Sequence, residues 1–436
     1  MVFLETDSPN KRCWEPALGA RLLLLTNRFP FESGEEYLET EIEYLSSEFR
    51  EIVILPVMIA PGDAPSAHRL VPRNCRIFPV GPGEGLKSKL TYVVRYLGRV
   101  LFTEREMLSG VGFHPLRILY QLYFSCRAEA ITETITSSIG PELARKEWIA
   151  YSYWLYATAA AAVRVRKKYP TVKYAVSRAH RYDVDVEASP LRFLPSRRYL
   201  IDNLDSVYPV GSNGAEQLRR VREGEGSAQV AVRRLGVDSI GAPRRRFSGE
   251  EVRFISCSTF NPLKRLPLLI ETLGAMQSCG VKVTWSHIGA SDHRRMDEME
   301  ELASRSLRPG TYEFLGRMSN LEVRREMSNP GWHFFIGLAS SEGVPVSCME
   351  ALSAGLPIIY TAVGDVPDLL VGESGGLLLG PDGGSAEYAA TICDWVDGMA
   401  KEEYEAQSRS ALSAWRTRWS ADANYSTFAR DLSSRA

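Results

Sequence analysis

Short apolar runs alternate with segments of helical spacing along most of this chain of 436 residues. The first run is Arg21–Thr26, and a second run at Glu51–Pro56 follows a helix-spaced stretch over residues 37–45. Strands that are buried on both faces of a parallel sheet give continuous apolar runs of this kind. The alternation therefore predicts β-α-β units and a doubly wound α/β fold.

Two such series are present, and the break between them predicts two domains. Residues 241–249 combine turn-forming glycine and proline with consecutive arginines, and we expect the interdomain linker there. The chain is also too long for a single hydrophobic core. We predict two Rossmann-like domains that face each other, residues 1–245 and 246–415, followed by a terminal helical part, residues 416–436.

Composition narrows the class of protein. Lysine plus arginine total 52 and aspartate plus glutamate total 53, so no overall field would draw the chain onto nucleic acid. The seven cysteines are scattered without a C-x-x-C pair, which predicts reduced thiols, a cytoplasmic protein and no structural zinc. No apolar window reaches about 18 residues and residues 1–20 lack an apolar core, so we expect neither a membrane span nor an export signal.

The most informative motif is a pair of acids, Glu342 and Glu350, separated by seven residues. A proline suited to a helix start and Gly355, suited to a helix end, predict a loop, a short helix and a strand. The helix start offers unpaired N–H groups and a positive dipole end, where a diphosphate would fit. The expected phosphate contacts are Gly343, Val344 and Pro345.

The two acids are expected to hold two different sugars. Glu350 lies about 7.5 Å along the helix axis from its start, far enough to pass a phosphate and accept hydrogen bonds from ribose hydroxyls. Glu342, in the preceding loop, would meet groups on the opposite side. The alternative is that Glu342 is an exposed loop acid and Glu350 a polar residue between strands. The apolar neighbours of Glu350 argue against it, because acids are rarely packed without a partner.

This segment resembles the E-x7-E signature of retaining glycosyltransferases of family 4, which have the two-domain GT-B fold. Residues 254–266, 285–291, 314–316 and 361–367 are similar to further family landmarks, so the resemblance covers the C-terminal half. Residues 28–35 and 177–183 more loosely resemble the branch that builds bacterial surface polysaccharides. The resemblance implies a donor-binding second domain, an acceptor-binding first domain and a last helix that crosses back to the first.

In open parallel sheets, ligands bind beyond the carboxyl ends of the strands, where Lys264, Gly289, Gly316 and Glu342 are predicted to lie. Lys264 has the compact charge suited to phosphate oxygens, and Arg265 could supply a second cation or face solvent. The stretch around Gly316 could present backbone groups to the nucleobase or be an ordinary strand end. Family members commonly carry an arginine where this chain has Thr259, and a glycine at position 265.

The first domain offers a second set of candidates. Gly34 and Glu35 open a predicted helix that could approach the diphosphate or the acceptor, or could form a glycine turn with a capping acid. His180 follows a strand, and the resemblance implies that it hydrogen-bonds sugar hydroxyls across the cleft. Its neighbours Arg178 and Asp183 could bind the acceptor or pair with each other.

Residues 86–102 and 113–126 form apolar stripes edged by basic side chains. Such helices could dock on a membrane to reach a lipid-linked sugar. Burial of the stripes against the first sheet is the favoured interpretation. Burial and membrane docking can both occur if they use different faces of these helices.

Together the residues and the resemblance predict a metal-independent, retaining hexosyltransferase. It would move a sugar from a UDP- or GDP-linked donor to a hydroxyl of a glycan or lipid-linked glycan, in surface polysaccharide biosynthesis at the inner face of the membrane. Glu342 and His180 are the predicted catalytic residues, and no cofactor or metal is expected. The letters Asp183-Val184-Asp185 fit a metal motif but lie outside the donor half. Alternatives are an epimerase or hydrolase of the same fold, and a non-catalytic relative that binds nucleotide-sugar.

Overall fold

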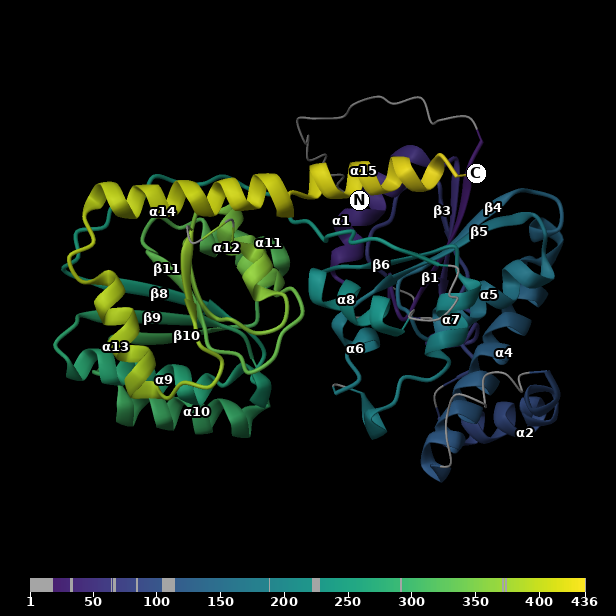
Figure 1. The fold of residues 1–436 in the computed structure, drawn as a ribbon, viewed down its shortest axis with the longest axis horizontal. Coiled ribbons are helices and arrows are strands. Elements are labelled where there is room, and N and C mark those ends of the chain that lie inside the picture. Colours follow the sequence, from purple (N-terminus) through teal and green to yellow (C-terminus); the bar gives the residue numbers. More distant parts are fainter. Residues whose placement is uncertain are drawn as a thin grey trace, which may run out of the picture.

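The structure is a computed structural model that describes residues 19–435, apart from residues 32–33, 64, 66–67, 84, 104–113, 188, 222–227, 291, 371 and 373–374. It contains two separate β-sheets with helices on both faces of each (Figure 1). Every strand pair is parallel in the described part of the chain. The predicted fold class, two Rossmann-like α/β domains, is confirmed.

The first sheet has the order β3-β2-β1-β4-β5-β6-β7, so successive strands are added on one side of β1 and, from β4 onward, on its other side. Its strands are β1 (Arg21–Thr26), β2 (Glu51–Pro56), β3 (Cys75–Ile77), β4 (Trp148–Ser152), β5 (Val172–Ala179), β6 (Ser206–Pro209) and β7 (Gln229–Val230). Its helices are α1 (Tyr37–Glu48), α2 (Leu86–Thr103), α4 (Pro115–Leu143), α5 (Ala157–Lys168), α6 (Arg181–Val184), α7 (Arg197–Asn203) and α8 (Ser212–Val221).

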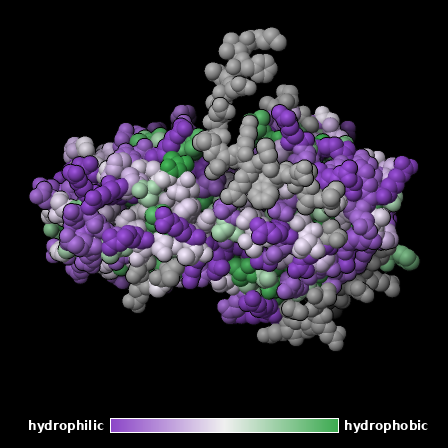
Figure 2. Space-filling model, turned by 90° about the horizontal axis from the view of Figure 1, so that it is seen from above, coloured by the Kyte–Doolittle hydropathy of each residue, from purple (hydrophilic) through white to green (hydrophobic). Residues whose placement is uncertain are grey.

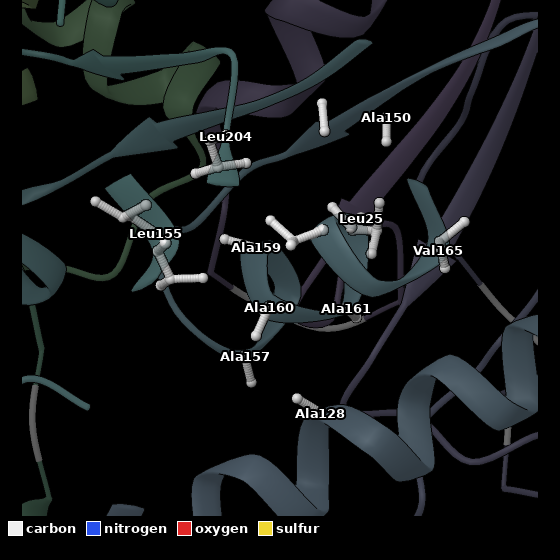
Figure 3. Close-up of a cluster of buried hydrophobic side chains, with 14 of the residues drawn as sticks. Leu25, Ala128, Ala150, Leu155, Ala157, Ala159, Ala160, Ala161, Val165 and Leu204 are labelled. Atoms are coloured by element: carbon white, nitrogen blue, oxygen red, sulfur yellow. The ribbon is translucent and has the colours of Figure 1, made fainter. Parts of the chain in front are cut away.

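Small side chains let α5 lie closely between this sheet and α4. Figure 3 shows Ala157 and Ala160 of α5 on the side of Ala128 of α4, with Leu25 of β1 on the other side of the helix. All four side chains are buried. Because interaxial distance depends on the side chains at the contact, alanines bring the two helices together. This packing fixes the turn between β4 and α5.

The second sheet has the order β10-β9-β8-β11-β12-β13. Its strands are β8 (Val252–Cys257), β9 (Val283–Ile288), β10 (Tyr312–Gly316), β11 (Phe334–Gly337), β12 (Ile358–Thr361) and β13 (Gly376–Leu379). The helices that follow β8 are α9 (Leu266–Ser278), α10 (His293–Ser306), α11 (Asn320–Met327), α12 (Val346–Ser353), α13 (Ser385–Val396), α14 (Lys401–Ala414) and α15 (Ala421–Ser433). Gly355 follows α12 with φ +68°, the left-handed conformation expected of a helix end.

The last two helices connect the domains. α14 lies along the second domain, and α15 continues over the first, where it packs against α1 (Figure 1). Tyr425 and Phe428 of α15 are buried, and the backbone N–H of Val237 donates to the carbonyl of Trp419 at 2.9 Å. Figure 2 shows the face that carries these helices as mostly hydrophilic.

The two apolar stripes are only partly buried. Tyr92, Tyr96 and Val100 of α2 pack against Cys126 and Ala130 of α4 in a small cluster of their own. The favoured burial against the first sheet is therefore wrong for α2, whose outward face is exposed. No helix in the described residues is both long enough and apolar enough to cross a membrane.

Candidate functional site

An acid, a lysine and a tyrosine meet at the carboxyl edge of the second sheet. Lys264 Nζ lies 2.5 Å from Glu342 Oε1, and the Tyr360 hydroxyl donates to the same oxygen at 2.7 Å. Lys264 follows β8, Glu342 follows β11 and Tyr360 belongs to β12, so three neighbouring strands deliver the cluster. The sequence analysis missed Tyr360, although its position at the end of a predicted strand could have indicated it.

Glu350 lies at a larger cavity of about 620 Å³ between the domains. Lining residues include Glu36 and Tyr37 from the first domain and Thr259, Gly289, Ala290, Arg317, Met318, Asn320, Val346, Ser347 and Glu350 from the second. The Glu350 side chain is nearly buried, and within the described residues its carboxylate has no hydrogen-bond partner. Burial raises the pKa of Glu350 to about 7, partly offset by the charge of Arg324.

Glu342, the other acid, lines a smaller cavity of about 150 Å³ that also has residues of the first domain in its wall. His180, Arg181 and Asp185 line it from the first domain, and Glu342 and Asp365 line it from the second. The two predicted catalytic residues therefore share one cavity across the domain boundary. The two acids of the motif, by contrast, border different cavities.

His180 is held as a neutral imidazole. Its ring centroid lies 4.6 Å from that of Trp154 and 5.0 Å from that of Tyr153. Burial and the nearby charge of Arg178 lower the pKa of His180 to about 3. Nε2 is buried and has no hydrogen-bond partner in the described residues. A ligand hydroxyl in the smaller cavity would satisfy this nitrogen.

Two glycines permit close backbone approach at the site. A Cβ on Gly289, which has φ +153°, would lie 1.9 Å from the carbonyl oxygen of Ser258. A Cβ on Gly364, which has φ +57°, would lie 1.9 Å from the carbonyl oxygen of Glu342. Gly364 was not singled out from the sequence, and it seats the loop that carries Glu342. Gly316, with φ +73°, accepts from the Gly289 N–H at 2.9 Å.

The start of α12 opens on the larger cavity. Val346 and Ser347, the first helical residues, line that cavity, and Pro345 is the residue before the helix rather than its first. Arg181 of the first domain reaches the same loop, because a Cβ on Gly343 would lie 3.1 Å from its Cβ. Gly343, Val344 and Pro345 thus lead into the helix start as predicted, with both cavities beside them.

Two predicted contacts have internal roles in this structure. Arg265 donates to the carbonyl of Leu338 at 2.5 Å and to that of Ala339 at 3.1 Å, so its charge is directed at the loop after β11. Glu35 accepts from three backbone N–H groups of the β1–α1 loop and from Trp154 Nε1 at 2.7 Å. Glu35 holds this loop, which includes Gly34, and the adjacent Glu36 is the acid that lines the larger cavity.

The neighbours of His180 also face inward. Arg178 is fully buried, with its guanidinium 2.8 Å from the Glu41 carboxylate, so the alternative that it pairs with Asp183 is wrong. Asp183 accepts from the N–H groups of Leu155 at 2.5 Å and His180 at 2.6 Å. Burial raises the pKa of Asp183 to about 7. Arg178 and Asp183 thus fix the strand end that presents His180, rather than reaching an acceptor directly.

No group of three or more His, Cys, Asp or Glu side chains that could hold a metal occurs among the described residues. In the sequence that fits a metal motif, Asp183 caps the α6 turn and Asp185 pairs with Arg181 at 3.3 Å. The two carboxylates are therefore engaged by the protein.

A second contact closes the cleft beside the smaller cavity. The Asp365 carboxylate accepts from the N–H of Asn213 at 2.7 Å, and Asp368 accepts from the N–H of Ser212 at 3.2 Å. Both N–H groups belong to the start of α8 in the first domain. A Cβ on Gly211 would lie 2.2 Å from the Asp365 carboxylate, so glycine is required for this approach.

Part of the second domain matches a family model, and about half of the chain is similar to two curated proteins. Residues 251–397 match the family model described as "Glycosyl transferases group 1". The chain is 23% identical over 223 residues to the "Putative colanic acid biosynthesis glycosyltransferase WcaL" of Salmonella typhimurium, covering 50% of this chain and 53% of that relative. A relative of the same name from Escherichia coli is 23% identical over 211 residues, covering 46% and 50%. The match thus spans about half the length of these relatives.

Solved structures of low sequence identity share the whole fold. Anabaena HepE in complex with UDP and glucose superposes with a TM-score of 0.62 at 13% identity, covering 95% of this chain and all of that one. Sucrose-phosphate synthase from Thermosynechococcus elongatus gives 0.66 at 14% identity, covering 96% and 100%. The Escherichia coli trehalose-6-phosphate protein bound with UDP-2-fluoro glucose gives 0.67 at 13%, covering 95% and 99%. The fold is therefore the GT-B arrangement of glycosyltransferases.

Proposed function

We propose that this protein is a retaining glycosyltransferase that moves a sugar from a UDP- or GDP-linked donor to a hydroxyl of a glycan acceptor. The observation that carries the proposal is the division of the acid pair. Glu350 borders the larger cavity and Glu342 the smaller one, with the start of α12 between them. One ligand with a nucleoside, a diphosphate and a sugar has three parts in this order.

Each part of the donor has a matching group. The Glu350 carboxylate, without a hydrogen-bond partner in the described structure, accepts hydrogen bonds from the ribose. Lys264 and the N–H groups at the start of α12 stabilise charge on the diphosphate as it leaves. Lys264 is held beside Glu342, and a bound phosphate oxygen would compete for it. Glu342 and Tyr360 then face the donor sugar.

The reaction follows from what the two domains bring together. His180 contributes a neutral Nε2 to the cavity that contains Glu342, where it hydrogen-bonds a hydroxyl of the donor sugar or acceptor. Glu342 steadies positive charge developing on the sugar ring. The acceptor attacks the face from which the diphosphate leaves, and a phosphate oxygen takes the acceptor's proton. Retention of configuration and independence from metal are expectations from the resemblance.

The biological setting is proposed from the relatives. Both curated relatives are named for colanic acid biosynthesis, which supports a role in building a surface polysaccharide. The donor would then be used in the cytoplasm, at the inner face of the membrane.

Incubation with a panel of donors, with and without acceptor glycans, tests the proposal. The correct donor should raise the melting temperature by mass action, and release of the nucleoside diphosphate should be slow until acceptor is added. Rapid release without acceptor would instead indicate a hydrolase, and a new sugar nucleotide an epimerase. The larger cavity has Thr259, which carries no charge, and Arg265 is bonded to a backbone carbonyl of the protein. Few cations are therefore left for the diphosphate. Tight donor binding without any turnover would therefore indicate a non-catalytic relative.

A further inference from the structure

Tyr37, the first residue of α1, belongs to the first domain but lines the larger cavity beside residues of the second. Its ring packs against an apolar cluster that consists mostly of second-domain residues. Val344 and Val346, at the start of α12, pack against the same cluster. Tyr37 therefore reaches across the domain boundary toward the helix start that is proposed to hold the diphosphate.

The hydroxyl of Tyr37 lies near both acids of the motif. Burial raises its pKa above the ordinary value, and the charges of Glu36, Glu350 and Glu342 raise it further. Glu342 and Glu350 border different cavities with the start of α12 between them, so a hydroxyl that is affected by both charges lies beside that helix start. The raised pKa also keeps the proton on the hydroxyl at neutral pH, where it can donate a hydrogen bond.

This hydroxyl has no hydrogen-bond partner in the part of the chain that the structure describes. Phenylalanine would serve equally well for packing, whereas a half-buried hydroxyl without a partner costs free energy. A ligand oxygen in the larger cavity would supply the partner. The ring and the hydroxyl of Tyr37 thus have separate roles, the ring in packing between the domains and the hydroxyl in binding a ligand.

The larger cavity is poor in positive charge. Arg317, which is exposed, is the one cation among its described lining residues, whereas Glu36 and Glu350 are acids. Of the cations nearby, Lys264 and Arg265 already have partners within the protein. A diphosphate bound here therefore needs uncharged donors as well, which hydroxyl and backbone N–H groups supply.

We infer that Tyr37 donates a hydrogen bond from the first domain to an oxygen of the donor's diphosphate. This inference adds a donor-binding residue and so rests on the proposed function. A diphosphate between Tyr37 and the start of α12 is held by both domains, so donor binding ties the first domain to the second. The hydroxyl serves the diphosphate, and binding of the nucleoside part does not depend on it.

Tyr37→Phe tests the inference, because it removes the hydroxyl and keeps the ring. Calorimetric titration should show affinity for UDP or GDP about tenfold lower than in the parent, as expected for a lost hydrogen bond to a charged group. Affinity for uridine or guanosine, measured by competition against the diphosphate, should be unchanged, because these probes lack phosphate. The melting temperature without nucleotide should also be unchanged, since the lost hydroxyl has no partner in the described structure.

Tyr44→Phe is the matched control. Tyr44 lies about two turns further along α1, and its ring packs against Tyr425 of α15, with 5.9 Å between ring centroids, instead of lining the larger cavity. This variant should bind UDP and GDP like the parent. Equal diphosphate affinity in Tyr37→Phe and the parent would overturn the inference. An equal loss of nucleoside affinity would also overturn it, because the hydroxyl would then contact the ribose or the base.

The inference and the proposed function fail in different ways. A parent protein that binds neither UDP nor GDP contradicts the proposed function, and the inference falls with it. A parent that binds a diphosphate no more tightly than its Tyr37→Phe variant contradicts the inference alone. A Tyr37→Phe protein that melts at a lower temperature and binds diphosphates and nucleosides equally weakly has lost structure, which would assign the hydroxyl to the fold and overturn the inference.

Discussion

At the scale of single residues, the two acids of the motif differ in their surroundings more than in their spacing. One carboxylate oxygen of Glu342 contacts both Lys264 and Tyr360, so this acid has partners within the protein. Glu350 has no hydrogen-bond partner among the described residues and a pKa of about 7. A buried acid without a partner is a cost to folding that a ligand with hydroxyl donors offsets.

Glu350→Gln tests this difference through pH. The pKa of Glu350 is raised from 4.5 to about 7, so nucleotide affinity should rise as pH increases through 7 and the carboxylate forms. At one pH unit below the pKa, affinity of the parent should be about tenfold weaker than at pH 8. Calorimetric titration with UDP and GDP from pH 5.5 to 8.5 measures this. The variant should bind about tenfold more weakly at pH 8 and lack this component of the pH dependence, leaving only the titration of the phosphate.

The same variant should be more stable than the parent at high pH. A folded-state pKa above the unfolded value means that folding favours the protonated acid, so this contribution is lost as pH rises from 4.5 to about 7. At pH 8 the glutamine should add about 1 to 3 kcal/mol to the free energy of unfolding. Denaturant unfolding at pH 5 and pH 8 measures the difference. Equal or lower stability at pH 8 would indicate that Glu350 supports the fold.

Substitutions of the adjacent cations at positions 264 and 265 should have different effects, the first on catalysis and the second on stability. Lys264→Ala should lower kcat by about a hundredfold to a thousandfold, because it removes a charge at the leaving diphosphate. Arg265→Ala should mainly lower the melting temperature, because its guanidinium bonds only carbonyls of the loop after β11. Turnover and thermal unfolding of both variants measure this. A Lys264→Ala protein with parental turnover would remove Lys264 from the site.

At the scale of elements, the edges of the second sheet were predictable and the packing between elements was not. The loop, helix and strand around residues 343–360 followed from proline, glycine and apolar runs, because these act over a few residues. Glu41 lies 137 positions from Arg178, and no local pattern predicts their pairing. For the same reason the sequence left the role of Glu35 open between a ligand contact and a capping acid. The structure shows Glu35 bonded to the loop before α1, and Glu36 beside it lines the larger cavity.

Gly364→Ala tests how the loop after β12 positions Glu342. An alanine Cβ would overlap the Glu342 carbonyl, so the loop must shift, and a shift of about 1 Å can lower kcat about a hundredfold. Nucleotide affinity, which depends on Glu350, should change little. Gly249→Ala is the matched control, because Gly249 also has a positive φ but nothing lies near its Cβ. Steady-state kinetics of both variants measure the effect, and equal kcat values would contradict it.

At the scale of the whole molecule, the site exists only where the domains meet. The smaller cavity needs His180 from one domain and Glu342 from the other, and Asp365 holds the start of α8 beside it. The sequence predicted two domains because its strand pattern breaks once. It could not predict the relative placement of the domains, which depends on contacts such as Gly211 against Asp365.

Asp365→Ala should loosen this placement. Losing the carboxylate leaves the Asn213 N–H without its partner, so the domains should open and kcat/KM should fall about tenfold to a hundredfold. Small-angle X-ray scattering should show a larger radius of gyration for this variant than for Asp382→Ala, which changes an exposed acid of the second domain. Identical scattering and kinetics would show that this contact does not set the domain placement.

The most direct measurement is a crystal structure of the protein with a bound sugar nucleotide. We expect the ribose hydroxyls on Glu350, the diphosphate between Lys264 and the start of α12, and the sugar between Glu342 and His180. A nucleotide bound with its diphosphate away from Lys264, or with its ribose away from Glu350, would contradict the proposed site.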